Sequence, residues 1–186
     1  MNLELGNHFL IAMPGMEDPN FSQTLTLICE HNESGAIGFV INRPTAVKLS
    51  SLVAEYSDAT EFASELENRF LFEGGPVETA RGFIMHSAEQ TWKTTLRVSD
   101  ALSVTASSDI IAAIAAGRGP EKFLFLIGYA GWGPGQLEQE ILDNAWLTGP
   151  ADPHIVFDLT PEARWRAAAL SLGVDLGLIP AQAGHA

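Results

Sequence analysis

The first part of the chain contains short apolar segments whose ends are marked by turn-forming residues. The segment HFLIAM at residues 8–13 predicts a strand, and the PGMEDPN that follows is turn-like. Residues 24–31 and 36–42, TLTLICEH and AIGFVIN, are rich in strand-forming residues and are joined by NESG, a short connection that ends in glycine. This pattern predicts a β-hairpin, and Pro44 is expected to stop its second strand.

Helical and strand-like segments follow in irregular order along the rest of the chain. Helices are predicted at residues 51–56, after Thr60, at 110–117 and at 160–173. Short strands are predicted at residues 70–76, 82–87, 92–98, 102–106 and 123–128, and the last is a continuous apolar run that should be buried. Because the strands have hairpin spacing and helices do not follow every strand, the pattern favours an α+β fold with a largely antiparallel sheet. The 186 residues contain no repeat or linker, so residues 1–186 are expected to form a single domain.

The acidity of the chain excludes one common class of function. Lys and Arg number 10 against 23 Asp and Glu, which gives a net charge of −13. Proteins that bind nucleic acid are usually basic, because neutralising phosphates supplies most of their affinity. The only close basic cluster here is RWR at residues 164–166. We therefore expect no direct binding to nucleic acid.

Hydropathy and cysteine content bear on location. No apolar run approaches the ~20 residues that a membrane-spanning helix needs. The N-terminal segment lacks the basic start of a signal peptide, and the single cysteine, Cys29, cannot form an internal disulfide. These features predict a cytoplasmic protein that does not associate with membranes.

The longer motifs are similar to those of a known family. The segments AMPGMEDPNF, ICEHNESGAIGFVINRP, FEGGPVETARGFIMH and GYAGWGPGQLEQEILDNAWL occur in this order. Together they resemble the YqgE/AlgH family of bacterial proteins, over nearly the whole chain from about His8 to Leu172. The resemblance implies a single α+β domain whose branched sheet curls into a partial barrel with flanking helices. It implies no reaction; the AlgH name implies a role in regulating alginate synthesis, which does not require direct DNA contact.

Cys29 and His31 could form a nucleophile and its base, since their spacing places both on one face of a strand. The alternative is that Cys29 continues the apolar face of Leu25 and Leu27 and acts as a small hydrophobic residue. The structural interpretation is favoured, because side chains of a catalytic pair usually converge from different elements.

The histidines give no sign of a metal site. They are dispersed and lack the close ligand pairs typical of zinc sites; those considered are His8, His31, His86 and His154. We expect no metal and no other cofactor.

Two polar motifs lie at predicted strand ends. In FEGGPVE, Glu73 precedes paired glycines, and a tight turn is a commoner use of such glycines than an anion-binding nest. In NRP, Asn42 and Arg43 follow the second hairpin strand. Arg43 could pair with Glu30 or Glu73, or it could bind a carboxylate or phosphate of a substrate.

The segment GYAGWGPGQLEQEI, residues 128–141, has the order strand, glycine-rich turn, helix that a phosphate-binding loop requires. It lacks the lysine and hydroxyl of such loops, and Glu138 and Glu140 already place negative charge on the first helical turns. We expect a packing corner whose glycines adopt conformations closed to other residues, namely Gly131, Gly133 and Gly135. The predicted core-facing residues of the following helix are Leu137, Ile141, Leu142 and Ala145.

Two functions remain open. The first is a non-enzymatic binding or regulatory protein that acts on a protein or small-molecule ligand. The second is a hydrolase or transferase whose polar residues converge from separate motifs: Glu30, His31, Arg43, His86 and Gln136. The candidate binding cleft comprises Glu30, His31, Asn42, Arg43, Glu73, His86, Trp132 and Gln136.

Overall fold

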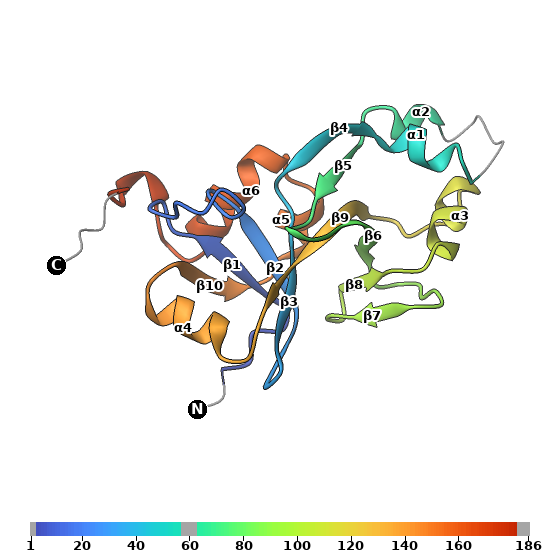
Figure 1. Cartoon of the computed structure of the whole chain (residues 1–186). Coiled ribbons are helices and arrows are strands. Elements are labelled where there is room, and N and C mark those ends of the chain that lie inside the picture. The colour runs from blue at the N-terminus through green and yellow to red at the C-terminus, as the bar shows by residue number, and fades with distance from the viewer. Residues whose placement is uncertain (1–2, 57–62, 182–186) are drawn as a thin grey trace.

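One mixed sheet connects all the strands of the described chain (Figure 1). The computed structural model describes residues 3–56 and 63–181. The strands are β1 (His8–Ala12), β2 (Leu25–Asn32), β3 (Gly35–Val40), β4 (Pro44–Lys48), β5 (Phe70–Glu73), β6 (Val77–Ser87), β7 (Thr95–Arg97), β8 (Leu102–Thr105), β9 (Phe123–Trp132) and β10 (Trp146–Pro150). The helices are α1 (Leu49–Val53), α2 (Ala63–Leu66), α3 (Asp109–Ala115), α4 (Gln136–Leu142), α5 (Pro153–Phe157), α6 (Pro161–Ser171) and the 3₁₀ turn η1 (Leu176–Leu178).

Strand β9 is the point at which the sheet branches. The main order is β10-β1-β2-β3-β9-β6-β8-β7, and β5 pairs with β9 in parallel while carrying β4 on its other side. The first half of β9 lies between β6 and β5, and its last residues pair with β3 instead of β5. The expected α+β class is confirmed, as is the curled, largely antiparallel sheet that forms a half-barrel.

The branch depends on a close approach of two backbones at glycines. Gly128 has a φ of +72°, and a Cβ atom there would lie 2.5 Å from the carbonyl oxygen of Gly75. A Cβ at Gly74 would lie 2.4 Å from the carbonyl oxygen of Gly128. Real Cβ contacts are not this short, so the EGGP and GYAG motifs need glycine where the β5–β6 connection crosses β9.

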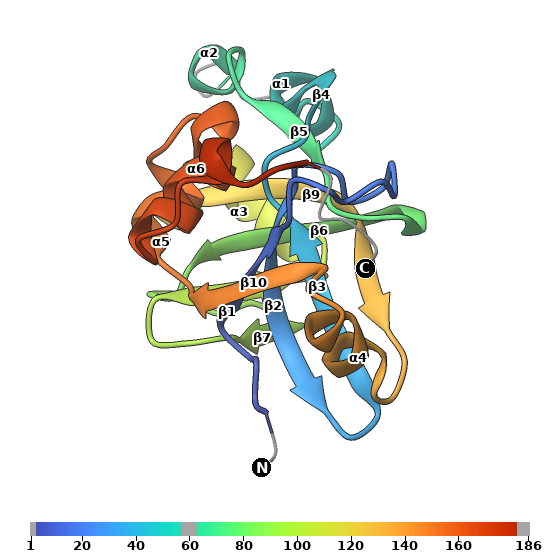
Figure 2. The ribbon, with the colours of Figure 1, turned by 90° about the vertical axis from the view of Figure 1, so that its left-hand side faces the viewer.

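Three apolar clusters stabilise the sheet. Helices α5 and α6 cover one face of β1 and β2, where Trp165 packs with Phe9 and Leu27 (Figure 2). Helix α4 covers the opposite side, where Leu137 packs with Trp132. Helices α1 and α3 enclose a third cluster at the far end of β6 and β9; its most buried members are Ile110, Leu49, Ala115 and Ile84.

Several elements differ from the prediction. Strand β9 continues to Trp132 rather than ending at Gly128, because its glycine-rich half still pairs with β3. Pro44 begins strand β4 instead of only stopping β3, which a strand's first position permits because Pro has no N–H to donate. Strand β10 and helix α5 were not predicted, and Leu142 is 76% exposed rather than core-facing.

The predicted helix at residues 51–56 begins earlier, as α1, and the residues directly after Thr60 lie outside the described part. Within residues 3–56 and 63–181, no helix has the length and apolar character that crossing a membrane requires.

Candidate functional site

His31 lies beside helix α4 rather than beside Cys29. A β-bulge between Ile28 and Glu30 shifts the register of β2 against β3, so Cys29 and His31 lie on different sides of the sheet. The expectation that they share one face was wrong. The Nδ1 atom of His31 accepts from the backbone N–H of Leu5 at 3.2 Å, so Nε2 carries the proton and donates to Glu138 at 2.8 Å.

Cys29 is a core residue, as the structural interpretation predicted. It is 8% exposed and belongs to the same cluster as Leu25 and Leu27. Burial raises the pKa of its thiol to about 12, with a further contribution from the nearby charge of Glu30. A thiol in this state is a poor nucleophile.

The glycine-rich corner is held together by the carboxylate of Glu140. Its Oε2 atom accepts from the indole N–H of both Trp132 and Trp146, each at 2.9 Å. Its Oε1 atom accepts from the side-chain amide of Gln136 at 3.0 Å, and the amide oxygen of Gln136 accepts from the backbone N–H of Gly133. The polar groups of this corner therefore bind one another.

Only part of the glycine prediction for this corner is correct. Gly135 has a φ of +72°, which disfavours other residues. Gly133 and Gly131 do not have positive φ, and an added Cβ would make ordinary contacts at both. The structure thus gives no backbone reason for glycine at these two positions.

Asn42 and Arg43 fix the loop that precedes β2. Asn42 accepts from the N–H of Leu25 and donates to the carbonyl of Gln23, each at 2.9 Å. Arg43 donates to the carbonyl oxygens of Asn20 at 2.7 Å and Ser22 at 2.9 Å. Among the described residues Arg43 has no ion pair with Glu30 or Glu73, so backbone carbonyls replace the carboxylate partners that we considered.

His86 is fully buried within a chain of hydrogen bonds. Its Nδ1 donates to the carbonyl of Ser87 and its Nε2 accepts from the hydroxyl of Thr105, each at 2.8 Å. Thr105 is joined at 2.7 Å to the hydroxyl of Thr95. Burial lowers the pKa of His86, so the imidazole is neutral and both of its nitrogens are occupied.

The two remaining candidates lie at the surface. Glu30 is exposed and accepts from the side chain of Asn32 at 3.0 Å. Glu73 is exposed at the end of β5. The structure therefore brings His31, Trp132 and Gln136 to one corner and places the other five candidates elsewhere. Among the described residues, no three His, Cys, Asp or Glu side chains are grouped as metal ligands would be.

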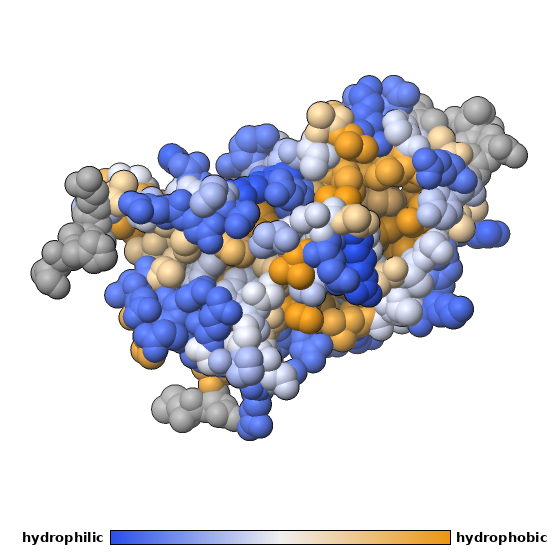
Figure 3. All heavy atoms as spheres, in the orientation of Figure 1, coloured by the Kyte–Doolittle hydropathy of each residue, from blue (hydrophilic) through white to orange (hydrophobic). Residues whose placement is uncertain are grey.

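A hollow on the face seen in Figure 3 lies where α1, β5, β6 and α3 meet. We call it the apolar groove. It has a volume of about 360 Å³, and its walls are largely hydrophobic. The apolar residues that form them include Leu52, Leu71, Ile84, Ile111 and Phe125.

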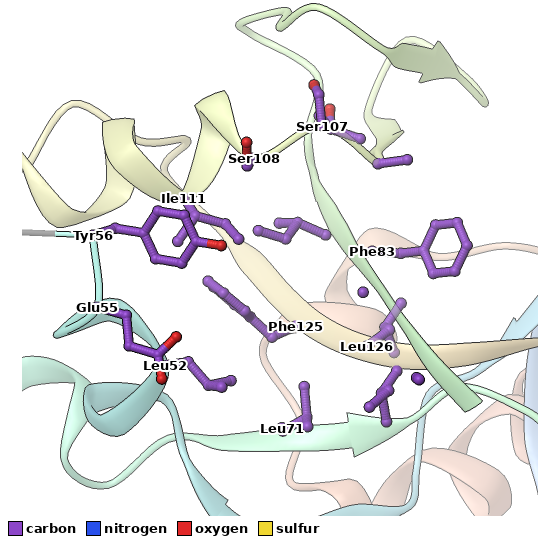
Figure 4. A pocket seen from close by; sticks show the side chains of 16 residues that line it. Leu52, Glu55, Tyr56, Leu71, Phe83, Ser107, Ser108, Ile111, Phe125 and Leu126 are labelled. Carbon is purple, nitrogen blue, oxygen red and sulfur yellow. The ribbon is translucent and has the colours of Figure 1, made fainter. Parts of the chain in front are cut away.

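Apart from the buried Thr105, the polar side chains that line the apolar groove lie at its rim. Figure 4 shows Glu55 and Tyr56, which follow α1, on one side and Ser107 and Ser108, which precede α3, on another, with Phe125 between them. Tyr56 is 47% exposed and its hydroxyl points into the hollow. An apolar cavity with a few polar groups at its rim is the usual form of a small-molecule site.

A second hollow lies on the other side of β6 and shares Phe83 and Ala106 with the apolar groove. Its volume is about 220 Å³, and Ile37 and Leu96, each 44% exposed, form part of its wall. Among the predicted cleft residues, Glu30 lines this hollow. Neither hollow could be predicted from the sequence, because the residues that line them occupy ordinary strand and helix positions.

Comparison with known proteins places this architecture in a family. The model of the AlgH-like family matches residues 9–177. A UPF0301 protein of Thioalkalivibrio sulfidiphilus is 56% identical over 180 residues, which cover 97% of this chain and 96% of the relative. The UPF0301 protein AlgH of Pseudomonas aeruginosa is 52% identical over 182 residues, covering 98% and 96%. The solution structure of the AlgH protein from Pseudomonas aeruginosa superimposes with a TM-score of 0.79 at 50% identity, covering 100% of this chain and 98% of that one. The chain therefore belongs to the AlgH-like family.

Proposed function

We propose that this protein is a non-enzymatic binding protein that holds a small molecule with an apolar body in the apolar groove. The observation that carries the proposal is the chemistry of the groove: largely hydrophobic walls around about 360 Å³, with a carboxylate and several hydroxyl groups at the rim. Such a site can bury an apolar body and orient it by a few hydrogen bonds.

The described polar residues support binding over catalysis. A hydrolase or transferase needs a nucleophile or base that is free to meet the substrate. Here Cys29 is protonated and buried, and the nitrogens of His31 and His86 are engaged in internal hydrogen bonds. Of the residues named for the enzymatic alternative, His31 and Gln136 lie at one corner, whereas Glu30, Arg43 and His86 lie elsewhere in the fold.

We further propose that any regulatory role, including one in exopolysaccharide synthesis as the likeness to AlgH suggests, is exerted through a ligand or protein partner without direct DNA contact. The net charge of −13 opposes binding to DNA. Arg164, which belongs to the one basic cluster of the sequence, is 3% exposed and points into the protein. Submicromolar binding to regulatory DNA that resists competitor DNA, in a mobility-shift assay at physiological salt, would contradict this proposal.

A substitution at Gly82 tests the groove directly. Gly82 lines the groove on β6, on the same face as Ile84, and a Cβ atom there would meet no atom within 4 Å. Gly82→Leu should therefore fill part of the hollow without disturbing the fold. The uncharged fluorescent probe N-phenyl-1-naphthylamine should bind the unmodified protein saturably, and Gly82→Leu should weaken this binding about tenfold or more.

Gly131→Leu is the matched control. Gly131 is an exposed strand glycine outside the groove, where an added Cβ meets only the Tyr129 ring, at 3.5 Å. This variant should bind the probe as the unmodified protein does. Absence of saturable binding, or equal binding by Gly82→Leu in a protein with an unchanged melting temperature, would refute the groove as the ligand site.

A further inference from the structure

A separate hollow of about 470 Å³ lies beneath β4 and β5, between the start of β9 and helices α5 and α6. Figures 1 and 2 both show α5 and α6 beside these strands. Phenylalanines form much of its wall, namely Phe70, Phe72, Phe123, Phe125 and Phe157. Two arginines from distant parts of the sequence, Arg69 before β5 and Arg164 on α6, also line it. We call it the arginine pocket.

Each arginine lies against an aromatic ring and a backbone carbonyl. The guanidinium carbon of Arg69 is 3.9 Å from the centre of the Phe123 ring, and its Nη2 donates to the Phe123 carbonyl. The guanidinium carbon of Arg164 is 5.1 Å from the centre of the Phe72 ring. Arg164 donates from Nε to the carbonyl of Leu159 and from Nη1 to that of Ile41. Stacking and carbonyl bonds hold both planar groups in fixed orientations.

One nitrogen of Arg164 remains open to the pocket. Its Nη2 makes no hydrogen bond to a described residue. The buried side-chain atoms without a partner in the described chain are Asn7 Oδ1 and Thr26 Oγ1, and Arg164 Nη2 is not among them. Because Arg164 lines the pocket, this nitrogen can donate to a ligand there.

Neither arginine has a carboxylate partner within the described part of the chain. The ion pairs there involve other residues, and Glu162, although it lines the pocket, is not within ion-pair distance of Arg164. Glu65 and Glu121 line a neighbouring hollow together with Arg69, and neither is within ion-pair distance of Arg69. Burial lowers the pKa of both arginines. For Arg164, whose pKa is lowered to about 10, the charge of Glu162 opposes this shift and the charge of Arg69 adds to it. Two cations in a partly apolar pocket, neither of them bonded to a carboxylate of the described chain, are unfavourable, and an anion bound between them would relieve this.

The structural contact of Arg69, with the carbonyl and ring of Phe123, is independent of that of Arg164. Arg164 joins α6 to the end of β3 through the carbonyl of Ile41. This link does not require a second guanidinium, from Arg69, in the wall of the same hollow. In a chain with 10 basic and 23 acidic residues, one buried and one half-buried arginine share a pocket and form no ion pair within the described residues, which points to a ligand.

We propose that the arginine pocket binds a small organic anion, with its carboxylate or phosphate group between Arg69 and Arg164 and its apolar body against the phenylalanines. Guanidinium groups suit both head groups because they donate parallel hydrogen bonds to paired oxygens. The volume of about 470 Å³ is in the range of small-molecule sites. This site shares only Phe125 with the apolar groove and does not depend on the function proposed for it.

Binding of matched probes to the full chain tests the site. Phenyl phosphate and phenylacetate represent the two head groups, phenylacetamide is the neutral counterpart, and inorganic phosphate tests the anion alone. Isothermal titration and melting temperature should reveal saturable binding of at least one aromatic anion, with tighter binding than inorganic phosphate and no binding of the amide. The better of the two anions identifies the head group.

Variants assign the binding to the pocket. Arg69→Gln should weaken binding of the preferred anion about tenfold or more, because it removes one charged donor. Arg164→Lys, which keeps a charge but loses the planar donor set, gives a second measurement if Arg164→Gln fails to fold. Arg166→Gln is the control, since Arg166 is an exposed arginine of the same helix, and it should bind as the unmodified protein does.

Three results would overturn this proposal. It is wrong if none of the anions binds at millimolar concentration, or if phenylacetamide binds as tightly as phenylacetate. It is equally wrong if folded Arg69→Gln and Arg166→Gln retain the same affinity. Because Gly82→Leu lies outside the pocket, it should leave anion binding unchanged, so failure of the groove and failure of this site are distinguishable.

Discussion

Replacing Gly128 with alanine should measure how much the close approach of β9 and the β5–β6 connection contributes to stability. Gly128 and Gly135 both have a φ of +72°, so alanine at either position carries the same conformational strain. They differ in surroundings, since a Cβ at Gly128 lies 2.5 Å from the Gly75 carbonyl oxygen and one at Gly135 meets nothing within 4 Å. The pair therefore separates backbone strain from steric overlap.

The expected magnitudes follow from these two terms. A left-handed conformation costs alanine about 1–2 kcal/mol, and the lower entropy of the unfolded chain offsets about 0.4–1 kcal/mol of this. Gly135→Ala should therefore destabilise by about 0.5–1 kcal/mol. Gly128→Ala adds an overlap with backbone that cannot rotate away, which should raise its total to about 2–4 kcal/mol.

Urea denaturation followed by tryptophan fluorescence measures both variants, and Gly133→Ala is the control. Gly133 lacks a positive φ, and an added Cβ there meets only the side chain of Gln136, at 3.9 Å, so this variant should be neutral or slightly stabilising. If Gly128→Ala and Gly135→Ala lose the same free energy of unfolding, the steric explanation of the crossing is refuted.

Three other predictions concern the polar and titratable groups of the core. Glu140→Ala should lower the free energy of unfolding by about 2–4 kcal/mol in urea denaturation, because the indoles of Trp132 and Trp146 lose their shared acceptor, and a loss below about 1 kcal/mol would contradict this. The native Cys29 thiol should react with a disulfide reagent only as fast as the protein opens, and rapid stoichiometric labelling of native protein would contradict the buried thiol. Because the pKa of this thiol is raised to about 12, its contribution to the free energy of unfolding should be fully present below the unfolded-state pKa and should fall as the pH rises above that value. The pKa of His86 is lowered, so the contribution of this side chain to the free energy of unfolding is present above the unfolded-state pKa of about 6.5 and is lost as the pH falls below it. The urea midpoint should therefore drop between pH 7 and pH 5, and His86→Gln should reduce that drop.

The fold could be predicted from the sequence where local pattern decides the structure. The hairpin of β2 and β3 and the helix that begins at Pro161 depend on turn and first-turn residues, and both formed as expected. Strand β10 was missed because Trp146–Pro150 contains glycine and proline and is stabilised by pairing with β1, more than 130 residues earlier in the chain. Local propensity carries no information about such a partner.

The candidate site was harder to predict than the fold. Side chains such as Arg43 and His86 looked chemically distinctive, but their roles are set by backbone carbonyls and hydroxyls that the tertiary structure supplies. Arg69, by contrast, belongs to no recognisable motif, and it became a candidate binding residue only because the structure places it in the same pocket as Arg164. The bulge beside Cys29 likewise changes which face His31 occupies, and strand periodicity cannot reveal it.

The central position of β9 also determines how this protein can fold as it leaves the ribosome. Strands β3, β5 and β6 are all synthesised before β9, yet each has an edge that only β9 covers. Strand β1 likewise has an edge that remains unpaired until β10 has been synthesised. The nascent chain therefore exposes several unpaired strand edges until about residue 150 has emerged. Chains that stop before Phe123 are expected to be substrates for chaperones and proteases rather than folded fragments, and the complete chain should fold slowly for its size because its decisive pairings are long-range.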